Sequence, residues 1–206
     1  MKTAFLAKHF LAVAAFLAIL FVVEPSQYFV WHRAAHHESF VQQAAIQGSG
    51  TVANLLTEGF EIVLSPQGNV GQRLENSIRS AHKRVWVTIY ILTDKPLLRA
   101  LTEAAARGVD VRLLFEGNVV GQPTINRKAA SALQKAGAKV AWSDASRFSY
   151  THAKYLVVDD TWWIGTGNFS HSTFTKNREF FVTSKNSAIL ETLTATFLAD
   201  FTHVPS

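Results

Sequence analysis

The sequence predicts one α/β domain per chain, built on a mixed β-sheet that helices flank on both faces. From residue 60 onward, apolar runs of strand length alternate with segments whose apolar residues recur at helical spacing. One run, Val85–Leu92, is apolar on both of its alternating faces, which is typical of a central strand covered on both sides. A chain of 206 residues with 48% hydrophobic residues is long enough for one such domain and its core.

The first half of this domain alternates strand and helix. The run Phe60–Leu64 has the length of a strand, and Arg73–Lys83 carries its apolar residues on one face of a helix. Asp94 can cap the next helix, whose end is marked by Gly108. Val109–Phe115 then returns as a strand.

The second half is predicted to contain shorter strands and a final helix. Asn126 caps a helix that runs through Ala136, and Gly137 follows it. Asn186 opens the last helix, whose apolar residues recur in steps of four. The strands expected between these two helices are Lys139–Trp142, Phe148–Thr151, Lys154–Val158, Trp162–Ile164 and Glu179–Thr183.

The N-terminus carries a pattern typical of an export signal. Met1–His9 contains two lysines, and Phe10–Val23 is an unbroken apolar run of 14 residues. A spanning helix needs about 17–25 residues, so a run of this length is typical of a signal-peptide core. No small-x-small cleavage pair follows it, so residues 1–26 are expected to be either a signal peptide or an uncleaved membrane anchor. A lead-in segment at 27–57 and the folded domain at 58–206 follow.

Composition excludes several kinds of site. The chain has no cysteine, which excludes a disulfide scaffold, a thiolate zinc site, an iron–sulfur cluster and a cysteine nucleophile. The formal net charge is +5, and residues 127–185 hold nine basic and four acidic residues. Such a concentration is expected of a surface that meets phosphate groups. On charge alone, a merely soluble basic protein is an equal alternative.

One segment contains the residue types that phosphate chemistry needs. His152 and Lys154 are two positions apart on a predicted strand, so both side chains project from the same face. Gly165-Thr166-Gly167-Asn168 allows a tight turn and a close backbone approach, and Glu179 offers a carboxylate to hold the imidazole. Together they supply a nucleophile or base and several donors for the oxygens of a phosphate diester. No carboxylate cluster suited to Mg²⁺ is apparent, so neither a metal nor a cofactor is expected.

The segment resembles the signature of the phospholipase D superfamily, H-x-K-x4-D followed by a G-[S/T]-x-N turn and a downstream glutamate. The matching residues are His152-Ala153-Lys154-Tyr155-Leu156-Val157-Val158-Asp159, then Gly165-Thr166-Gly167-Asn168, and then Asn177-Arg178-Glu179. The resemblance extends weakly back to about residue 60 and implies that 58–206 is a phospholipase D-like catalytic domain. The gap before Gly165 is one residue shorter than usual, so either Asp159 or Asp160 corresponds to the motif aspartate, which in this family is usually structural.

The number of motif copies adds to this interpretation. Well-known members of the family carry two copies in one chain and build one active site from both, whereas this sequence carries one. It is most similar to the small exported bacterial endonucleases of the family, in which two chains pair. The resemblance therefore implies a homodimer with a shared active site. It also implies a location in the bacterial periplasm or outside the cell, with membrane contact only if the N-terminal segment is an uncleaved anchor in the inner membrane.

The family mechanism implies a role for each matched residue. His152 would attack phosphorus to form a phosphohistidine, and the partner subunit's His152 would protonate the leaving oxygen and later activate water. Lys154 and Asn168 would hold the phosphoryl oxygens. Glu179 would accept a hydrogen bond from the ring nitrogen that does not attack.

Three further residues are candidates for substrate binding: Thr166, Lys176 and Arg178. Thr166 would assist at the phosphate, and the two basic residues would contact a nucleic-acid backbone. Each has a structural alternative. A turn hydroxyl often bonds only backbone, and Glu179 could form an ordinary ion pair with Arg178.

These observations predict a metal-independent phosphodiesterase, an endonuclease that hydrolyses DNA or RNA. Two identical histidines on one phosphate must differ in protonation, so the rate is expected to follow a bell-shaped pH profile. One alternative is a phospholipase D or phosphatidyltransferase acting on phospholipid, for which the membrane signal is some support. The other is a nucleic-acid-binding protein that retains the fold without catalysis.

Overall fold

The computed structural model describes residues 59–202, and the export or anchoring segment and the lead-in expected at 1–26 and 27–57 lie outside this range. Within it, seven strands form one sheet in the order β1-β7-β6-β5-β2-β3-β4. Strands β2, β3 and β4 are parallel to one another and the remaining pairs are antiparallel, so the sheet is mixed as predicted. The strands are β1 (Glu61–Ser65), β2 (Arg84–Ile89), β3 (Asp110–Phe115), β4 (Lys139–Trp142), β5 (Lys154–Val158), β6 (Thr161–Gly165) and β7 (Glu179–Ser184).

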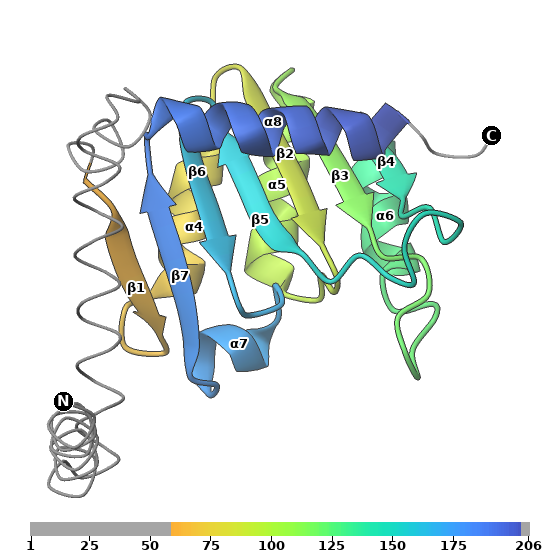
Figure 1. Cartoon of the computed structure of the whole chain (residues 1–206), viewed down its shortest axis with the longest axis horizontal. Helices are drawn as coiled ribbons and strands as arrows, with labels where there is room; N and C mark the ends of the chain where they lie inside the picture. The colour runs from red at the N-terminus through yellow and green to blue at the C-terminus, as the bar shows by residue number, and fades with distance from the viewer. Residues whose placement is uncertain (1–58, 203–206) are drawn as a thin grey trace, which may run out of the picture. The chain divides into compact units, whose positions relative to one another are not determined.

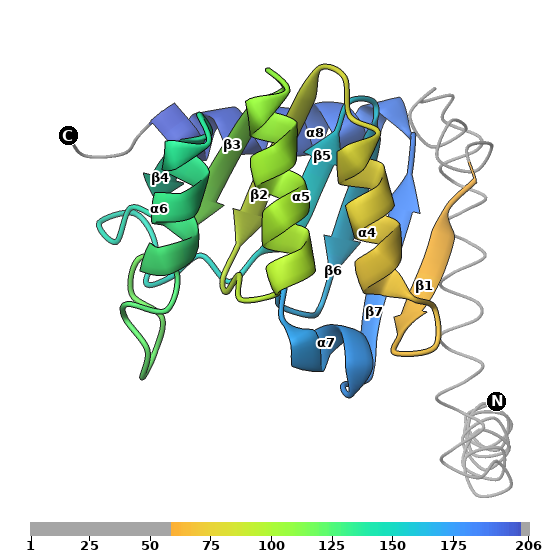
Figure 2. The ribbon, with the colours of Figure 1, turned by 180° about the vertical axis from the view of Figure 1, so that it is seen from behind.

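Helices cover both faces of the sheet, which confirms the predicted fold class. Helices α4 (Val70–Arg79), α5 (Lys95–Ala106) and α6 (Arg127–Lys135) lie on one face (Figure 2). On the other face, α8 (Ser187–Thr202) crosses the strands (Figure 1). A short helix, α7 (His171–Thr175), lies at the edge of the sheet between β6 and β7.

Strand β2 is central and is buried on both faces, as its sequence predicts. Val85, Val87 and Ile89 are fully buried in the core beneath α4, α5 and α6. Trp86 points to the other face and stacks on Phe197 of α8, with 5.3 Å between ring centroids. Burying side chains of this size contributes about 1.5–3 kcal/mol each. The strand is therefore fixed from both sides.

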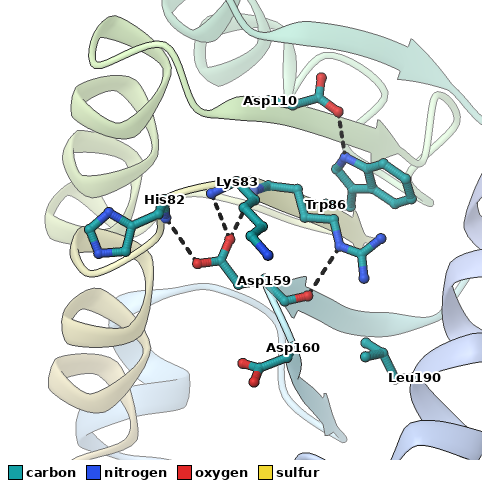
Figure 3. Close-up of a pocket in the computed structure, with 8 residues that line it drawn as sticks. His82, Lys83, Trp86, Asp110, Asp159, Asp160 and Leu190 are labelled. Atoms are coloured by element: carbon teal, nitrogen blue, oxygen red, sulfur yellow. Dashed lines mark hydrogen bonds between the residues drawn. The ribbon is translucent and has the colours of Figure 1, made fainter.

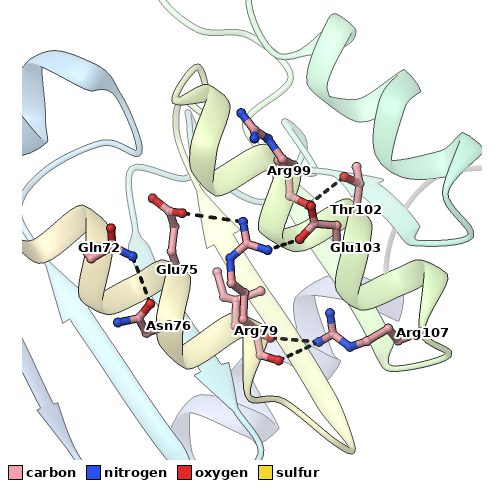
Figure 4. Close-up of polar contacts among 9 residues, drawn as sticks. Gln72, Glu75, Asn76, Arg79, Arg99, Thr102, Glu103 and Arg107 are labelled. Carbon is pink, nitrogen blue, oxygen red and sulfur yellow. Dashed lines mark hydrogen bonds and ion pairs between the residues drawn. The ribbon is translucent and has the colours of Figure 1, made fainter.

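Polar contacts join α4 to α5 on the outer surface (Figure 4). Arg79 pairs with Glu103 of α5 and lies 3.8 Å from Glu75 of its own helix. Arg107 donates to the carbonyl oxygens of Ile78 and Arg79, at 3.4 and 3.0 Å. Exposed ion pairs contribute about 0–1 kcal/mol each, so the apolar core accounts for most of the packing between these helices.

The predicted strand Phe148–Thr151 is wrong. The backbone turns before it, where the N–H of Arg147 donates to the carbonyl oxygen of Asp144 at 3.1 Å. At its other end, the N–H of Thr151 donates to the carboxylate of Glu116 at 2.6 Å. Because these donors bond to a turn and to a side chain, the segment does not join the sheet.

Two helices also differ from the prediction. Helix α4 spans Val70–Arg79 rather than Arg73–Lys83. Helix α7 was not predicted, because a helix of five residues is too short to show a periodic pattern. The hydroxyl of Ser170 caps it by accepting from the N–H of Thr173 at 3.3 Å.

Asp159 fixes the turn that follows β5 (Figure 3). Its carboxylate accepts hydrogen bonds from the backbone N–H groups of residues 82, 83 and 84, at 2.9, 2.8 and 2.9 Å. Its own backbone is left-handed, with φ of 51°. Asp160 points to solvent and lies 3.4 Å from the ammonium of Lys185. Of the two alternatives, Asp159 is therefore the aspartate with a structural position.

A pocket opens beside Asp159, and its lining does not include His152 or Lys154. Its lining residues are His82, Lys83, Arg84, Trp86, Asp110, Asp159, Asp160 and Leu190 (Figure 3). Strand β5 begins at Lys154 and ends at Val158, so Asp159 and the pocket lie at the opposite edge of the sheet from His152 and Lys154.

We expect Asp159→Asn to lower the free energy of unfolding at neutral pH by about 1–3 kcal/mol, because an amide oxygen replaces a carboxylate that accepts three backbone bonds. Burial alone would raise the pKa of Asp159, but the N–H groups of Arg84, His82 and Lys83 outweigh it and hold the pKa below the ordinary 3.8. The stabilisation is therefore present above that pH and is lost as the pH falls through the lowered pKa. Urea unfolding at several pH values measures this.

Asp160→Asn is the matched control, since its side chain is exposed and should change stability by less than about 0.5 kcal/mol. Equal effects of the two substitutions would contradict the structural role of Asp159.

Candidate active site

The motif residues gather at one edge of the sheet. Strand β5 begins there at Lys154, β7 begins at Glu179 and β6 ends at Gly165. The same edge holds the carboxyl end of β2, where Ile89 pairs with Lys154. In open α/β sheets, ligands bind at the carboxyl ends of the parallel strands, so this is the edge expected to hold a site.

His152 and Lys154 lie side by side. His152 precedes β5 rather than lying on it, and Lys154 is its first residue. The Lys154 Nζ is 3.0 Å from the His152 Nδ1. The ring of Tyr90 contacts both: its centroid is 4.6 Å from that of His152, edge to face, and 5.5 Å from the Lys154 Nζ. Lys154 is only 6% exposed, whereas His152 is open to solvent, so a buried ammonium is fixed against an accessible imidazole.

These surroundings lower the pKa of both groups. Partial burial lowers the pKa of His152, and the charge of Lys154 lowers it further. Burial also lowers the pKa of Lys154, and the nearby carboxylate of Glu179 opposes this. His152 therefore remains neutral to a lower pH than an ordinary histidine, and the neutral ring is the nucleophilic form.

Glu179 is held by Thr166. The Thr166 Oγ1 donates to the Glu179 Oε2 at 2.5 Å and accepts from the N–H of Phe180 at 3.1 Å. The Asn177 Nδ2 lies 3.5 Å from the other carboxylate oxygen. Among residues 59–202, His152 is not a hydrogen-bond partner of Glu179, so the predicted Glu179–imidazole bond is not formed within one chain. The single hydroxyl hydrogen of Thr166 is used by Glu179, and a contact of Thr166 with substrate stays a prediction.

Lys176 and Arg178 lie on the exposed loop between α7 and β7. The Arg178 Nη1 donates to the Oε1 of Gln67 at 2.8 Å, so the alternative ion pair of Arg178 with Glu179 is not the contact that the structure contains. The structure thus brings four of the predicted residues together as two pairs, His152 with Lys154 and Thr166 with Glu179. Lys176 and Arg178 stay outside these pairs, on the exposed loop.

The glycines of the turn are required for space. A Cβ on Gly167 would lie 2.5 Å from Thr173 and 2.9 Å from Glu179, and one on Gly165 would lie 2.4 Å from the ring of Phe181. Neither glycine is among those with positive φ. The predicted close approach is therefore correct, and no left-handed backbone is involved.

Asn168 follows this turn, and the oxygen of its side-chain amide is buried. The N–H of Phe169 donates to the carbonyl oxygen of Ile91 at 3.0 Å, which places Asn168 beside the end of β2. The Asn168 Oδ1 is buried without a hydrogen-bond partner in the described part of the chain. Buried polar atoms are nearly always paired, so the unpaired Oδ1 marks this position as a candidate for ligand contact. The atom of this side chain that can donate to a phosphoryl oxygen is the Nδ2.

Glu116 supports the site and was not predicted. It is 3% exposed and follows the end of β3. Its carboxylate accepts from the N–H of Thr151 at 2.6 Å, from the Ser143 hydroxyl at 2.8 Å and from the N–H of Asn118 at 2.7 Å. Thr151 immediately precedes His152, so Glu116 fixes the backbone that presents the imidazole. A carboxylate directly after an apolar strand was the signal available in the sequence.

Asn126 is the N-cap residue of α6, as predicted, and its carbonyl oxygen accepts from the N–H of Ala130 at 2.9 Å, but its side chain bonds to the loops of the site. Its Oδ1 accepts from the N–H of Leu92 at 3.0 Å, and its Nδ2 donates to the carbonyl oxygens of Tyr90 and Glu116 at 2.8 and 3.2 Å. Its side chain makes no cap bond to α6. Asn126 instead links the ends of β2 and β3 beneath the site.

Across residues 59–202, no group of three or more histidine, cysteine, aspartate or glutamate side chains is arranged to hold a metal ion. No helix in the same range combines the length and the apolar character needed to cross a bilayer.

Residues 74–201 match the family described as "Cardiolipin synthase, PLD-like domain". A cardiolipin synthase of Clostridium perfringens is 31% identical over 150 residues, which cover 69% of this chain and 31% of that protein. Cardiolipin synthase A of Pseudomonas aeruginosa is 33% identical over 128 residues, which cover 60% of this chain and 26% of that protein. The chain thus spans less than a third of the length of these curated relatives.

Two solved structures are similar in fold. One is Nuc from Salmonella typhimurium, described as a phospholipase D family member, with a TM-score of 0.65 and 23% identity over 72% of this chain and 97% of that chain. The other is NucT from Helicobacter pylori, with a TM-score of 0.60 and 20% identity over 71% of this chain and 98% of that chain.

We expect Glu116→Gln to loosen the segment before His152. A glutamine cannot accept all three bonds, and losing one buried bond costs about 1–3 kcal/mol. The amide hydrogen of Thr151 should therefore exchange with solvent at least about tenfold faster, as measured by hydrogen exchange with mass spectrometry or NMR. Glu191→Gln on the exposed surface of α8 is the control. Unchanged exchange at Thr151 would show that Glu116 does not hold this segment.

Proposed function

This chain belongs to the phospholipase D superfamily, and on that premise we propose that it is a metal-independent phosphodiesterase that hydrolyses DNA or RNA through a phosphohistidine on His152. The observation that carries the proposal is the 3.0 Å contact between the buried ammonium of Lys154 and the ring of His152, at the edge where the parallel strands end. A fixed positive charge beside an accessible neutral imidazole suits attack on an anionic phosphate diester.

The contact also defines what substrate binding must change. An ammonium only donates, so the His152 Nδ1 accepts in this geometry and the proton of the neutral ring lies on Nε2. For Nε2 to attack, its lone pair must be free and the proton must lie on Nδ1. A phosphate oxygen that takes over the ammonium of Lys154 releases Nδ1, and Glu179 is the carboxylate proposed to accept its proton as a hydrogen bond.

The reaction then proceeds in two displacements. The Nε2 lone pair of His152 forms a bond to phosphorus as the bond to the leaving oxygen breaks, and that oxygen takes a proton from an acid. In the second step, the acid, which has lost its proton, acts as a base and removes a proton from water. The water oxygen then attacks phosphorus and displaces Nε2. Lys154 and Asn168 hold the phosphoryl oxygens in both steps.

The acid is proposed to be the partner subunit's His152 in a homodimer. The ammonium of Lys154 is committed to phosphate oxygens, and His82 lies at the opposite edge of the sheet, beside Asp159. His171 is exposed on α7 and serves in the test below as the comparison histidine. A second His152 provides an imidazolium with the proton that the leaving oxygen needs.

Charge supports a nucleic acid as the substrate. Residues 127–185 hold nine of the basic residues and four acidic ones, and both motif pairs lie within this range. Lys176 and Arg178 are exposed on the loop that leads to Glu179, where a backbone phosphate next to the scissile one could contact them.

A second candidate function is phosphatidyl transfer to or from phospholipid. The curated relatives are named cardiolipin synthases, after a phospholipid product. Exposed apolar side chains also lie near the site: Phe148 and Tyr150, 46% and 52% exposed, precede His152. Val120, 70% exposed, is held at Tyr90 by a hydrogen bond of 3.0 Å from its N–H to the tyrosine hydroxyl. Acyl chains could contact these groups.

One assay separates the candidates. Plasmid DNA, RNA and phospholipid vesicles containing cardiolipin are offered separately to the full chain in the presence of a chelator. We expect cleavage of nucleic acid, a loss of about a thousandfold or more in His152→Ala, and near wild-type rates in His171→Ala. Turnover of lipid alone would establish the second candidate, and no turnover of any substrate would favour nucleic-acid binding without catalysis.

We expect the rate to follow a bell-shaped pH profile, since one histidine must be neutral and the other protonated. Burial and the charge of Lys154 lower the pKa of His152, so the acid limb should lie below the ordinary value of 6.5. The rate falls below that limb because the nucleophile is protonated and falls at higher pH because the acid is lost. Initial rates measured at constant ionic strength test this, and a flat profile would contradict a pair of histidines.

A further inference from the structure

The pocket beside Asp159 takes no part in the mechanism proposed above. Its volume is about 710 Å³, which is within the range of small-ligand sites. Three consecutive basic residues at the start of β2 line it, His82, Lys83 and Arg84, and α8 contributes Leu190 (Figure 3). The pocket is therefore a second cationic feature of the domain, and the proposed chemistry does not explain it.

The guanidinium of Arg84 is held so that its two terminal nitrogens stay available. Its Nε donates to the carbonyl oxygen of Asp159 at 3.1 Å, and its Cζ lies 5.0 Å from the ring centroid of Trp86. That ring is fixed in turn, because Trp86 is 7% exposed and stacks on Phe197. Within residues 59–202, neither Nη1 nor Nη2 of Arg84 makes a hydrogen bond or an ion pair. Two donors in one fixed plane fit two oxygens of a phosphate group.

The carboxylates of the pocket are engaged elsewhere and do not take up these donors. The carboxylate of Asp159 accepts its three backbone bonds. Asp160 lies 3.4 Å from the ammonium of Lys185, and Asp110 lies 2.9 Å from the Nε of Arg112. Each acidic side chain of the pocket therefore has its own partner, and none is an ion-pair partner of Arg84.

Lys83 adds a second cation to the same pocket. Its side chain is exposed and makes no hydrogen bond or ion pair within the described residues 59–202. Lys83 and Arg84 are thus two neighbouring positive charges without a counter-charge in this part of the chain. A pocket with spare cations and occupied carboxylates favours an anionic ligand.

The pocket and the candidate active site lie at opposite ends of β5. Lys154 begins this strand of five residues and Asp159 directly follows it. A strand rises about 3.3 Å per residue, so about 17 Å separates the two positions. Along one strand of a duplex, phosphates follow one another about every 3.4 Å, so this distance corresponds to about five nucleotides. A polymer with repeated phosphates can occupy both places, whereas one phospholipid headgroup cannot.

We propose that this pocket is a second phosphate-binding site, in which the terminal nitrogens of Arg84 and the ammonium of Lys83 bind a backbone phosphate of the nucleic acid away from the scissile bond. The identity of the polymer rests on the proposed function, whereas the affinity of the pocket for phosphate does not. Such a contact holds the substrate in position without reading its sequence.

Phosphate binding is tested without turnover, in the full chain carrying His152→Ala. The indole N–H of Trp86 donates to Asp110 at 3.0 Å, so its NMR signal reports on the pocket. Inorganic phosphate should shift this signal saturably, and adding Arg84→Gln should weaken the titration at least about tenfold. Arg99→Gln is the matched control, because Arg99 is exposed on α5, on the other face of the sheet (Figure 4). No saturable shift, or equal titrations with and without Arg84→Gln, would overturn the site.

Oligonucleotides test the ligand on the same His152→Ala background. Arg84→Gln should weaken binding of a strand of about 20 nucleotides roughly tenfold and lower the salt dependence of its affinity by about one phosphate contact. Binding of a dinucleotide, which is too short to reach the pocket, should not change. Lys83→Gln is the second variant, because the Lys83 side chain makes no bond within residues 59–202 and its replacement should leave the unfolding midpoint unchanged.

The outcomes separate this inference from the proposed function. Loss of the phosphate titration with unchanged binding of the long strand would restrict the pocket to free phosphate and refute the nucleic-acid ligand. Equal losses for the dinucleotide and the long strand would refute a site separate from the active site. Binding as expected by a chain that cleaves no substrate supports the pocket and refutes the proposed function. Cleavage of nucleic acid that both variants leave unchanged overturns the pocket and leaves the chemistry in place.

Discussion

Lys154 is only 6% exposed, so its ammonium needs partners, which are the carbonyl oxygen and the Nδ1 of His152, at 2.5 and 3.0 Å, and the ring of Tyr90. This contact depends on two strand ends meeting at one edge: β5 supplies the lysine and the segment before it the histidine, and β2 leads into the tyrosine. Glu116 and Asn126 bind these ends through buried hydrogen bonds. The site is thus built on rigid elements, with each loop tied by a side chain from another part of the chain.

The two edges of the sheet have different tasks. At one edge, the carboxylate of Asp159 accepts hydrogen bonds from three backbone N–H groups, and the backbone of Asp159 itself is left-handed. Both oxygens of this carboxylate are bonded within the protein. At the other edge, His152 is exposed to solvent and the Asn168 Oδ1 lacks a protein partner among residues 59–202. Unused hydrogen-bonding capacity is what distinguishes a site for a ligand from a structural network. One short sequence motif therefore contributes both to stability and to the candidate chemistry.

The sequence by itself determined the elements and the motif, because periodicities of two and 3.6 residues are local and because His152, Lys154, Asp159, Asn168 and Glu179 follow in order along the chain. It located β2 as a central strand and the mixed sheet that contains it. Only the tertiary structure decided that Phe148–Thr151 is not a strand, that the side chain of Asn126 joins two loops while its backbone begins α6, and that Glu179 bonds to Thr166. Each of these depends on a partner from another part of the chain: the Thr151 N–H on Glu116, the Asn126 amide on Tyr90, and the Glu179 carboxylate on Thr166. Local patterns specify which segments form; the packing of distant segments specifies where each polar group finds its partner.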